Sequence, residues 1–158
     1  MGSSDNPAGA IYGTIVVMAA IAGGGVGRGV QVATILAGAV GAGLVFWIAH
    51  VYTEVIAIRV AGGEATVGAD VRRAMHEQRA ILEAVFVPGA VLLLGVAGTF
   101  DHDTAVFLAL IAGLVDLFAW GIAHGRAVGL PRHQVLLVGL VDVAFGAVIV
   151  VLEVLLHH

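Results

Sequence analysis

Histidines and carboxylates recur at helical spacing in the middle of the chain. His50 and Glu54 are four residues apart and His76 and Glu83 are seven apart, so each pair would share one face of a helix. Imidazole and carboxylate groups together suit Zn²⁺, Fe²⁺ or Mn²⁺, and they equally suit proton relay. We therefore predict a metal site formed by His50, Glu54, Glu83, His76 and Glu77. A purely structural His–Glu pair is the alternative.

A second set of ionisable residues lies nearer the C-terminus. Asp116 and His124 are eight residues apart with Trp120 between them, and Asp142 follows a predicted turn near Gly129–Leu130. At helical rise, both aspartates would lie about 20 Å from that turn, at matching depth. Two carboxylates at one level in a low-dielectric bundle would not both ionise readily, so they would share a proton or a cation. We predict an ion path or proton relay through Asp116, His124 and Asp142. The alternative is that each aspartate only accepts a hydrogen bond from a neighbouring helix.

The composition defines the elements that must position these groups. Hydrophobic residues make up 60% of the 158 residues and charged residues 11%, and the mean hydropathy is +1.06. A soluble domain is about half apolar and a quarter charged, whereas one membrane span needs about 20 apolar residues. The chain therefore predicts an all-α integral membrane protein with a single transmembrane domain over 1–158. The five expected helices cover about 8–25, 30–58, 80–99, 104–123 and 135–156, and a short amphipathic helix at about 70–80 precedes the third.

Several kinds of chemistry are excluded by residue types that the chain lacks. It contains no cysteine, so disulfides, iron–sulfur centres and thiolate zinc sites cannot form. It contains no lysine, so it cannot hold retinal or pyridoxal phosphate as a Schiff base. No HExxH motif and no haem-type pair of histidines is present. We therefore expect no enzyme activity, no permanently bound cofactor and no nucleic-acid partner.

The arginines predict how the chain crosses the membrane. Six of the seven lie in the connections after the second and fourth helices: Arg59, Arg72, Arg73, Arg79, Arg126 and Arg132. Because arginine is enriched on the cytoplasmic side, the N-terminus should be cytoplasmic and the C-terminus outside. Richness in Ala, Gly, Val and Arg is typical of a GC-rich bacterial genome. The expected location is thus the bacterial inner (plasma) membrane, as a multi-pass protein.

Two stretches of the chain resemble the vacuolar iron transporter family. The runs YGTIVVMAAIAGGGVG and TILAGAVGAGLVFWIAHVYTE resemble its opening hairpin, and GIAHGRAVGL with QVLLVGLVDVAFGAVI resembles its closing hairpin. The resemblance implies five helices, a cytoplasmic N-terminus and a homodimeric exchanger of divalent metal for protons. It also places Tyr12 where the family has an acid on the metal path, which adds Tyr12 to the predicted ion path.

These observations predict a small homodimeric transporter, either of a divalent cation (Fe, Mn or Zn) or coupled to protons. His50 and Glu54 would load the ion, which is a substrate rather than a resident cofactor. The alternative is a membrane module that transports nothing and binds a partner protein or lipid. In both cases the lipid bilayer is the first partner.

Overall fold

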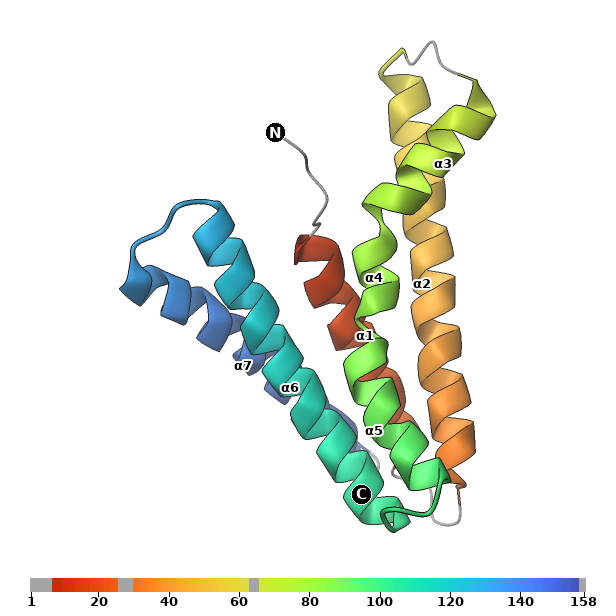
Figure 1. Ribbon diagram of the computed structural model, residues 1–158, viewed down its shortest axis with the longest axis vertical. Helices are drawn as coiled ribbons and strands as arrows, with labels where there is room; N and C mark the ends of the chain where they lie inside the picture. Colours follow the sequence, from red (N-terminus) through yellow and green to blue (C-terminus); the bar gives the residue numbers. More distant parts are fainter. Residues whose placement is uncertain (1–6, 26–29, 63–65, 157–158) are drawn as a thin grey trace.

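The computed structural model describes residues 7–25, 30–62 and 66–156, and within these ranges the secondary structure is entirely helical. This confirms the all-α prediction. Figure 1 shows the helices in chain order: α1 (Pro7–Gly25), α2 (Val32–Val60), α3 (Val67–Glu77), α4 (Arg79–Glu83), α5 (Phe86–Val96), α6 (His102–Ala127) and α7 (Arg132–Leu156).

Four segments are long and apolar enough to cross a membrane: Ala8–Gly25, Val32–Val60, Arg79–Val96 and His102–Ala127. They correspond to the first four predicted spans, with ends that differ by a few residues. Such helices satisfy their own backbone hydrogen bonds, which hydrocarbon requires. The multi-pass membrane character is therefore compatible with the structure. A helix also covers the fifth predicted segment, as α7, but its crossing of the membrane stays a prediction.

The third predicted helix is broken in two. It was expected to be continuous over 80–99, but α4 ends at Glu83 and α5 begins at Phe86. Pro88 explains the break, because it has no N–H to donate and its ring meets the carbonyl of the residue four positions earlier, Ala84. At the other end, Gly98 has a positive φ of 81°, so α5 stops at Val96.

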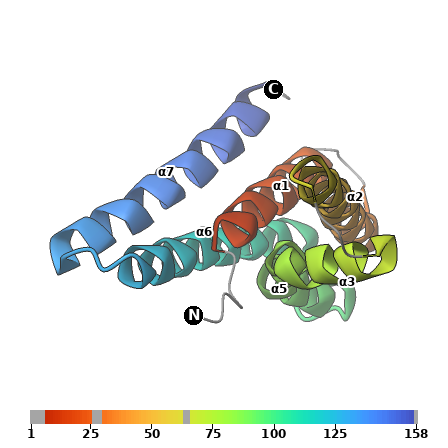
Figure 2. The ribbon, with the colours of Figure 1, turned by 90° about the horizontal axis from the view of Figure 1, so that it is seen from above.

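α1 is the centre of the packing. It contacts α2, α4, α6 and α7, and Figure 2 shows it lying among them in the view from above. α6 in turn packs against α1, α5 and α7. The buried cluster at the α1–α2–α5–α6 contact consists of Val17, Ile21, Ile35, Ala39, Leu92 and Ala109.

A row of small residues lets α6 approach its neighbours closely. The buried positions of α6 recur every four residues: Ala105, Ala109, Gly113, Leu117, Gly121 and Gly125. A Cβ at Gly121 would lie 2.6 Å from Gly139 Cα of α7. Small residues at such contacts allow van der Waals packing between helix backbones, which holds helices together in lipid.

The ends of α6 are fixed by local hydrogen bonds. Asp101 accepts from the backbone N–H and the hydroxyl of Thr104, both at 2.9 Å, and these bonds hold the pKa of Asp101 below its ordinary value. At the C-terminal end, Gly129 has a φ of +75° and Leu130 N–H donates to the Gly125 carbonyl at 3.0 Å. The chain then turns into α7. Figure 1 places this turn and α3 toward the same end of the molecule, on opposite sides of it, and the six arginines noted above belong to the segments at or next to these two places. We call this end the arginine-rich end.

The α6–α7 contact generates a test. We expect Gly121→Ala to lower the free energy of unfolding by about 1–3 kcal/mol, because the added methyl meets the α7 backbone. Gly41→Ala in α2 is the matched control, since nothing lies within 4 Å of a Cβ there. Thermal unfolding of the two variants in detergent measures the difference. Equal unfolding temperatures of Gly121→Ala and Gly41→Ala would show that α6 and α7 do not pack closely at Gly121.

Candidate functional site

A cavity of about 540 Å³ lies between α1, α6 and α7. Its lining is mostly apolar: Ala8, Ile11, Tyr12, Ile15, His124, Val138, Asp142 and Phe145. Three of the four residues predicted for the ion path, Tyr12, His124 and Asp142, thus come together from three helices. Few polar groups in an otherwise apolar pocket are typical of a binding or transfer site. We name this feature the α1–α6–α7 cavity.

Asp142 is held against α6 by the close packing of the two helices. Its Oδ2 is buried where it meets Gly121, and among the described residues this atom has no hydrogen-bond partner. His124 is near enough to interact with it electrostatically. An unpaired carboxylate in an apolar setting is costly, so Asp142 requires a proton, an imidazolium neighbour or water. Both residues line a cavity that has room for water, which could supply the missing hydrogen bond to Asp142.

Asp116 faces α1 instead. The buried hydroxyl of Thr14 lies 3.1 Å from Asp116 Oδ2 and 2.9 Å from the Ala10 carbonyl. A hydroxyl carries one hydrogen and can donate only one full hydrogen bond. Both contacts are therefore strong together only when the Asp116 carboxyl carries a proton and donates it to Thr14. The indole of Trp120, one turn along α6, also interacts with this carboxyl group.

The two aspartates do not take the shared arrangement that their matching depth suggested. Side chains on a helix lean toward its N-terminus, and α6 and α7 run in opposite directions. Asp142 therefore leans toward the α6–α7 turn and meets Gly121, whereas Asp116 leans away from the turn and meets Thr14. α6 therefore has two separate polar sites, Asp116 beside Thr14 and Gly121 beside Asp142, whereas the spacing had suggested a single shared site.

His50 and Glu54, which were predicted to load the ion, lie in the half of α2 that ends with Arg59. His50 Nδ1 is 3.0 Å from the Phe46 carbonyl, which favours a hydrogen on Nδ1 and leaves Nε2 as the free ligand atom. Glu54 lies close enough to Arg73 of α3 to raise the pKa of that guanidinium slightly, after the larger effect of Glu77. Glu54 is thus near α3, which carries two of the other predicted ligands, whereas the hydrogen bond of His50 stays within α2.

The remaining predicted ligands are on α3 and α4. Arg73 Nε donates to Glu77 at 2.8 Å, Arg79 Nε is 3.5 Å from Glu83, and His76 is exposed. Within the ranges that the structure describes, no three His, Asp or Glu side chains gather closely enough to hold a metal ion. The five-residue metal site stays a prediction.

One ion pair with a buried carboxylate was not predicted from the sequence. The short helix was expected to begin at about residue 70, but α3 begins at Val67 with Thr66 as its N-cap. Asp70 lies inside the helix, and its Oδ2 is 2.8 Å from Arg59 Nη2, without the alignment of a hydrogen bond. Its side chain is only 5% exposed, so the pair fastens α3 to the end of α2. The spacing within one helix carries no signal for a partner on another.

The Thr14–Asp116 contact generates a second test. We expect Thr14→Val to lower the free energy of unfolding by about 1–3 kcal/mol, because the variant keeps the shape but leaves a carboxyl group without its partner. Thr14→Ser should restore most of the loss. Thr34→Val, at an exposed position of α2, is the matched control. Denaturation in detergent measures the free energy of unfolding of each variant. Equal values for Thr14→Val and Thr34→Val would contradict the contact between Thr14 and Asp116.

Comparison with known protein families, with curated proteins and with solved structures finds no match for this chain. The resemblance to vacuolar iron transporters rests on the sequence runs given above.

Proposed function

We propose that this protein is a proton-coupled transporter of the bacterial plasma membrane and that it exchanges a divalent cation for protons as a homodimer. Its five helices would cross the membrane with the N-terminus in the cytoplasm, and α3 would lie at the membrane surface. The α1–α6–α7 cavity, in which Tyr12, His124 and Asp142 line an apolar space, is the observation that carries the proposal.

The proton step uses His124 and Asp142. An imidazole beside a carboxyl group can accept a proton from one side and release it to the other. Ionisable groups within membrane segments are costly, and they commonly mark proton or ion pathways. Water entering the cavity would connect this pair to the arginine-rich end, and the Tyr12 hydroxyl would extend the relay along α1.

Asp116 would couple the proton to the packing of α1. When its carboxyl group is protonated, Thr14 can donate to Ala10 and accept from Asp116 together. When Asp116 is ionised, Thr14 must divide its one hydrogen between the two oxygens. A proton gained or lost at Asp116 would thereby strengthen or weaken the link between α1 and α6.

Loading of the cation would take place at the arginine-rich end, through His50, Glu54, Glu83, His76 and Glu77. Glu54 and Glu77 both lie near Arg73, so a divalent cation would have to displace that guanidinium or draw on both copies of a dimer. The cation is proposed from the residue types and the family resemblance. The proton step is proposed because Tyr12, His124 and Asp142 line one cavity.

The test is ion flux into proteoliposomes that contain the purified protein, with Fe²⁺, Mn²⁺ and Zn²⁺ outside and a pH dye inside. We expect cation uptake accompanied by proton exit. Asp142→Asn and His124→Gln should each slow the proton movement by about 100-fold, the range expected for loss of a proton-transfer group. Asp103→Asn is the control, because Asp103 is exposed in the first turn of α6, the helix that carries His124. This variant should move protons like the unchanged protein.

Two further variants address the cation. Glu54→Gln and His50→Ala should weaken cation uptake while the protein still folds and inserts. Normal uptake in both would remove them from the loading site but would leave the proton step standing. Proton movement that is unaffected in both Asp142→Asn and His124→Gln would contradict the proposed function itself.

A further inference from the structure

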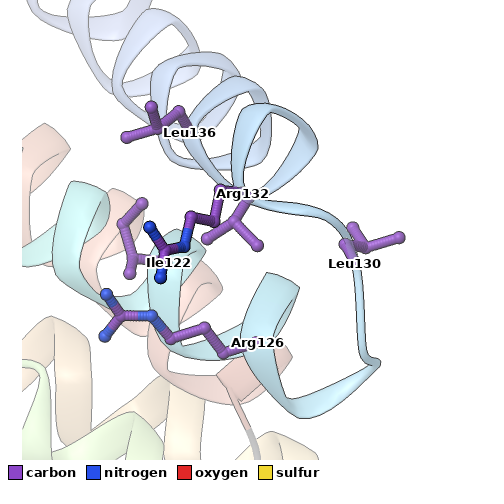
Figure 3. A pocket seen from close by; sticks show the side chains of 6 residues that line it. Ile122, Arg126, Leu130, Arg132 and Leu136 are labelled. Atoms are coloured by element: carbon purple, nitrogen blue, oxygen red, sulfur yellow. The ribbon is translucent and has the colours of Figure 1, made fainter.

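A second pocket lies at the α6–α7 hairpin turn, and none of its lining residues belongs to the proposed transport path. It has a volume of about 560 Å³ and is shown in Figure 3; its lining consists of Ile122, Arg126, Leu130, Arg132, Val135 and Leu136. Two arginines thus line one space with four aliphatic side chains, and no carboxylate belongs to the lining.

The two guanidinium groups have no anionic partner among the residues that the structure describes. Arg126 and Arg132 are both exposed, and no described carboxylate forms an ion pair with either of them. Figure 3 shows both side chains reaching toward Ile122, one from each helix of the hairpin. Arg59 and Arg73, by contrast, each lie 2.8 Å from a carboxylate oxygen. Two like charges that line one pocket repel each other unless an anion lies between them.

The pocket also lies at a defined level of the protein. α6 is long and apolar enough to cross a membrane over His102–Ala127, so a bilayer that it spans would have its hydrocarbon–water boundary near Arg126 in the last turn. Ile122 is one turn further into the apolar part of α6, and Val135 and Leu136 are one turn further along α7. The two guanidinium groups thus reach into this space from its outer end toward Ile122, and aliphatic side chains of both helices line it further in. Lipid phosphates occupy the outer level and acyl chains the inner one.

We propose that this pocket is a binding site for the phosphate of an anionic phospholipid. Arg126 and Arg132 hold the phosphate oxygens from two sides, since a guanidinium presents paired donors that match phosphate geometry. The aliphatic side chains contact the glycerol and the first carbons of an acyl chain. Because the two arginines come from successive helices, the bound phosphate links the end of α6 to the start of α7. The recognised chemistry is a phosphate group, and the apolar inner wall favours a lipid over free phosphate.

The experiment is native mass spectrometry of the full-length protein in detergent, titrated with phosphatidylglycerol or with phosphatidylcholine. We expect saturable binding of one phosphatidylglycerol per chain and much weaker binding of phosphatidylcholine. R126Q/R132Q should weaken phosphatidylglycerol binding by about 30-fold, from the contribution expected of two arginines near a lipid phosphate. R72Q/R73Q removes the same charge from α3 and should leave this binding in place.

Comparison of the two double variants distinguishes a specific site from general attraction between arginines and anionic lipid. Equal losses in R126Q/R132Q and R72Q/R73Q, or no loss in either, would overturn the proposal. Inorganic phosphate added to the protein with phosphatidylglycerol bound distinguishes the source. Displacement of phosphatidylglycerol by millimolar phosphate would keep the phosphate site but assign it to the free ion.

A measurement on the unchanged protein covers the case in which R126Q/R132Q does not fold. A photoactivatable phosphatidylglycerol, crosslinked and digested, should label peptides that contain residues 122–136. Labelling confined to other segments would overturn the assignment. R126K/R132K keeps the charges but loses the paired donors, and its binding should fall between that of the unchanged protein and that of the glutamine variant.

Discussion

The close approach of α6 to its neighbours is the constraint on which the other features depend. Two helices in lipid gain little from burying apolar side chains, so they associate through backbone contact at small residues. Gly121 and Gly125 bring α7 against α6, and Gly113 receives Met18 of α1. Since the α7 backbone lies so near Gly121, the Asp142 carboxylate is pressed against α6 and remains beside His124. The position of Asp142 in the cavity thus depends on the close α6–α7 contact at Gly121.

The polar groups within the bundle are divided between two faces of α6. One face meets Thr14 of α1 through Asp116, and the other meets α7 through Gly121 and His124. Because α1 contacts both α6 and α7, a change at either polar site can reach the other through α1. A proton-coupled transporter needs such a connection between the group that takes up a proton and the helices that must move. The end of α2, α3 and α4 take no part in these contacts of α6. Ion pairs stabilise them instead, and Asp70, the partner of Arg59, is the most buried carboxylate among these pairs.

Much of the fold could be predicted from the sequence, because hydropathy and length alone identify a helix that can cross a membrane. Tyr12, His124 and Asp142 were also named from the sequence, and they line one cavity. The details that differ have a common cause. Spacing along a helix gives a residue's depth, but neither the direction in which its side chain leans nor its partner on another helix. Asp116 and Asp142 therefore lie beside different neighbours, and the spacing gave no signal that Asp70 of α3 would pair with Arg59 of α2.

The access of water to the α1–α6–α7 cavity can be measured directly, because the chain has no cysteine and a single introduced cysteine can be labelled alone. Ile15→Cys places a thiol in the cavity lining, and Val115→Cys places one beside Asp116 on an exposed face of α6. A water-soluble thiol reagent added to membrane vesicles should modify Ile15→Cys and spare Val115→Cys, which lipid covers. Both cysteines should react after denaturation. An Ile15→Cys protein that resists the reagent as fully as Val115→Cys would mean that the cavity is dry, and protons could not then reach His124 and Asp142 through it.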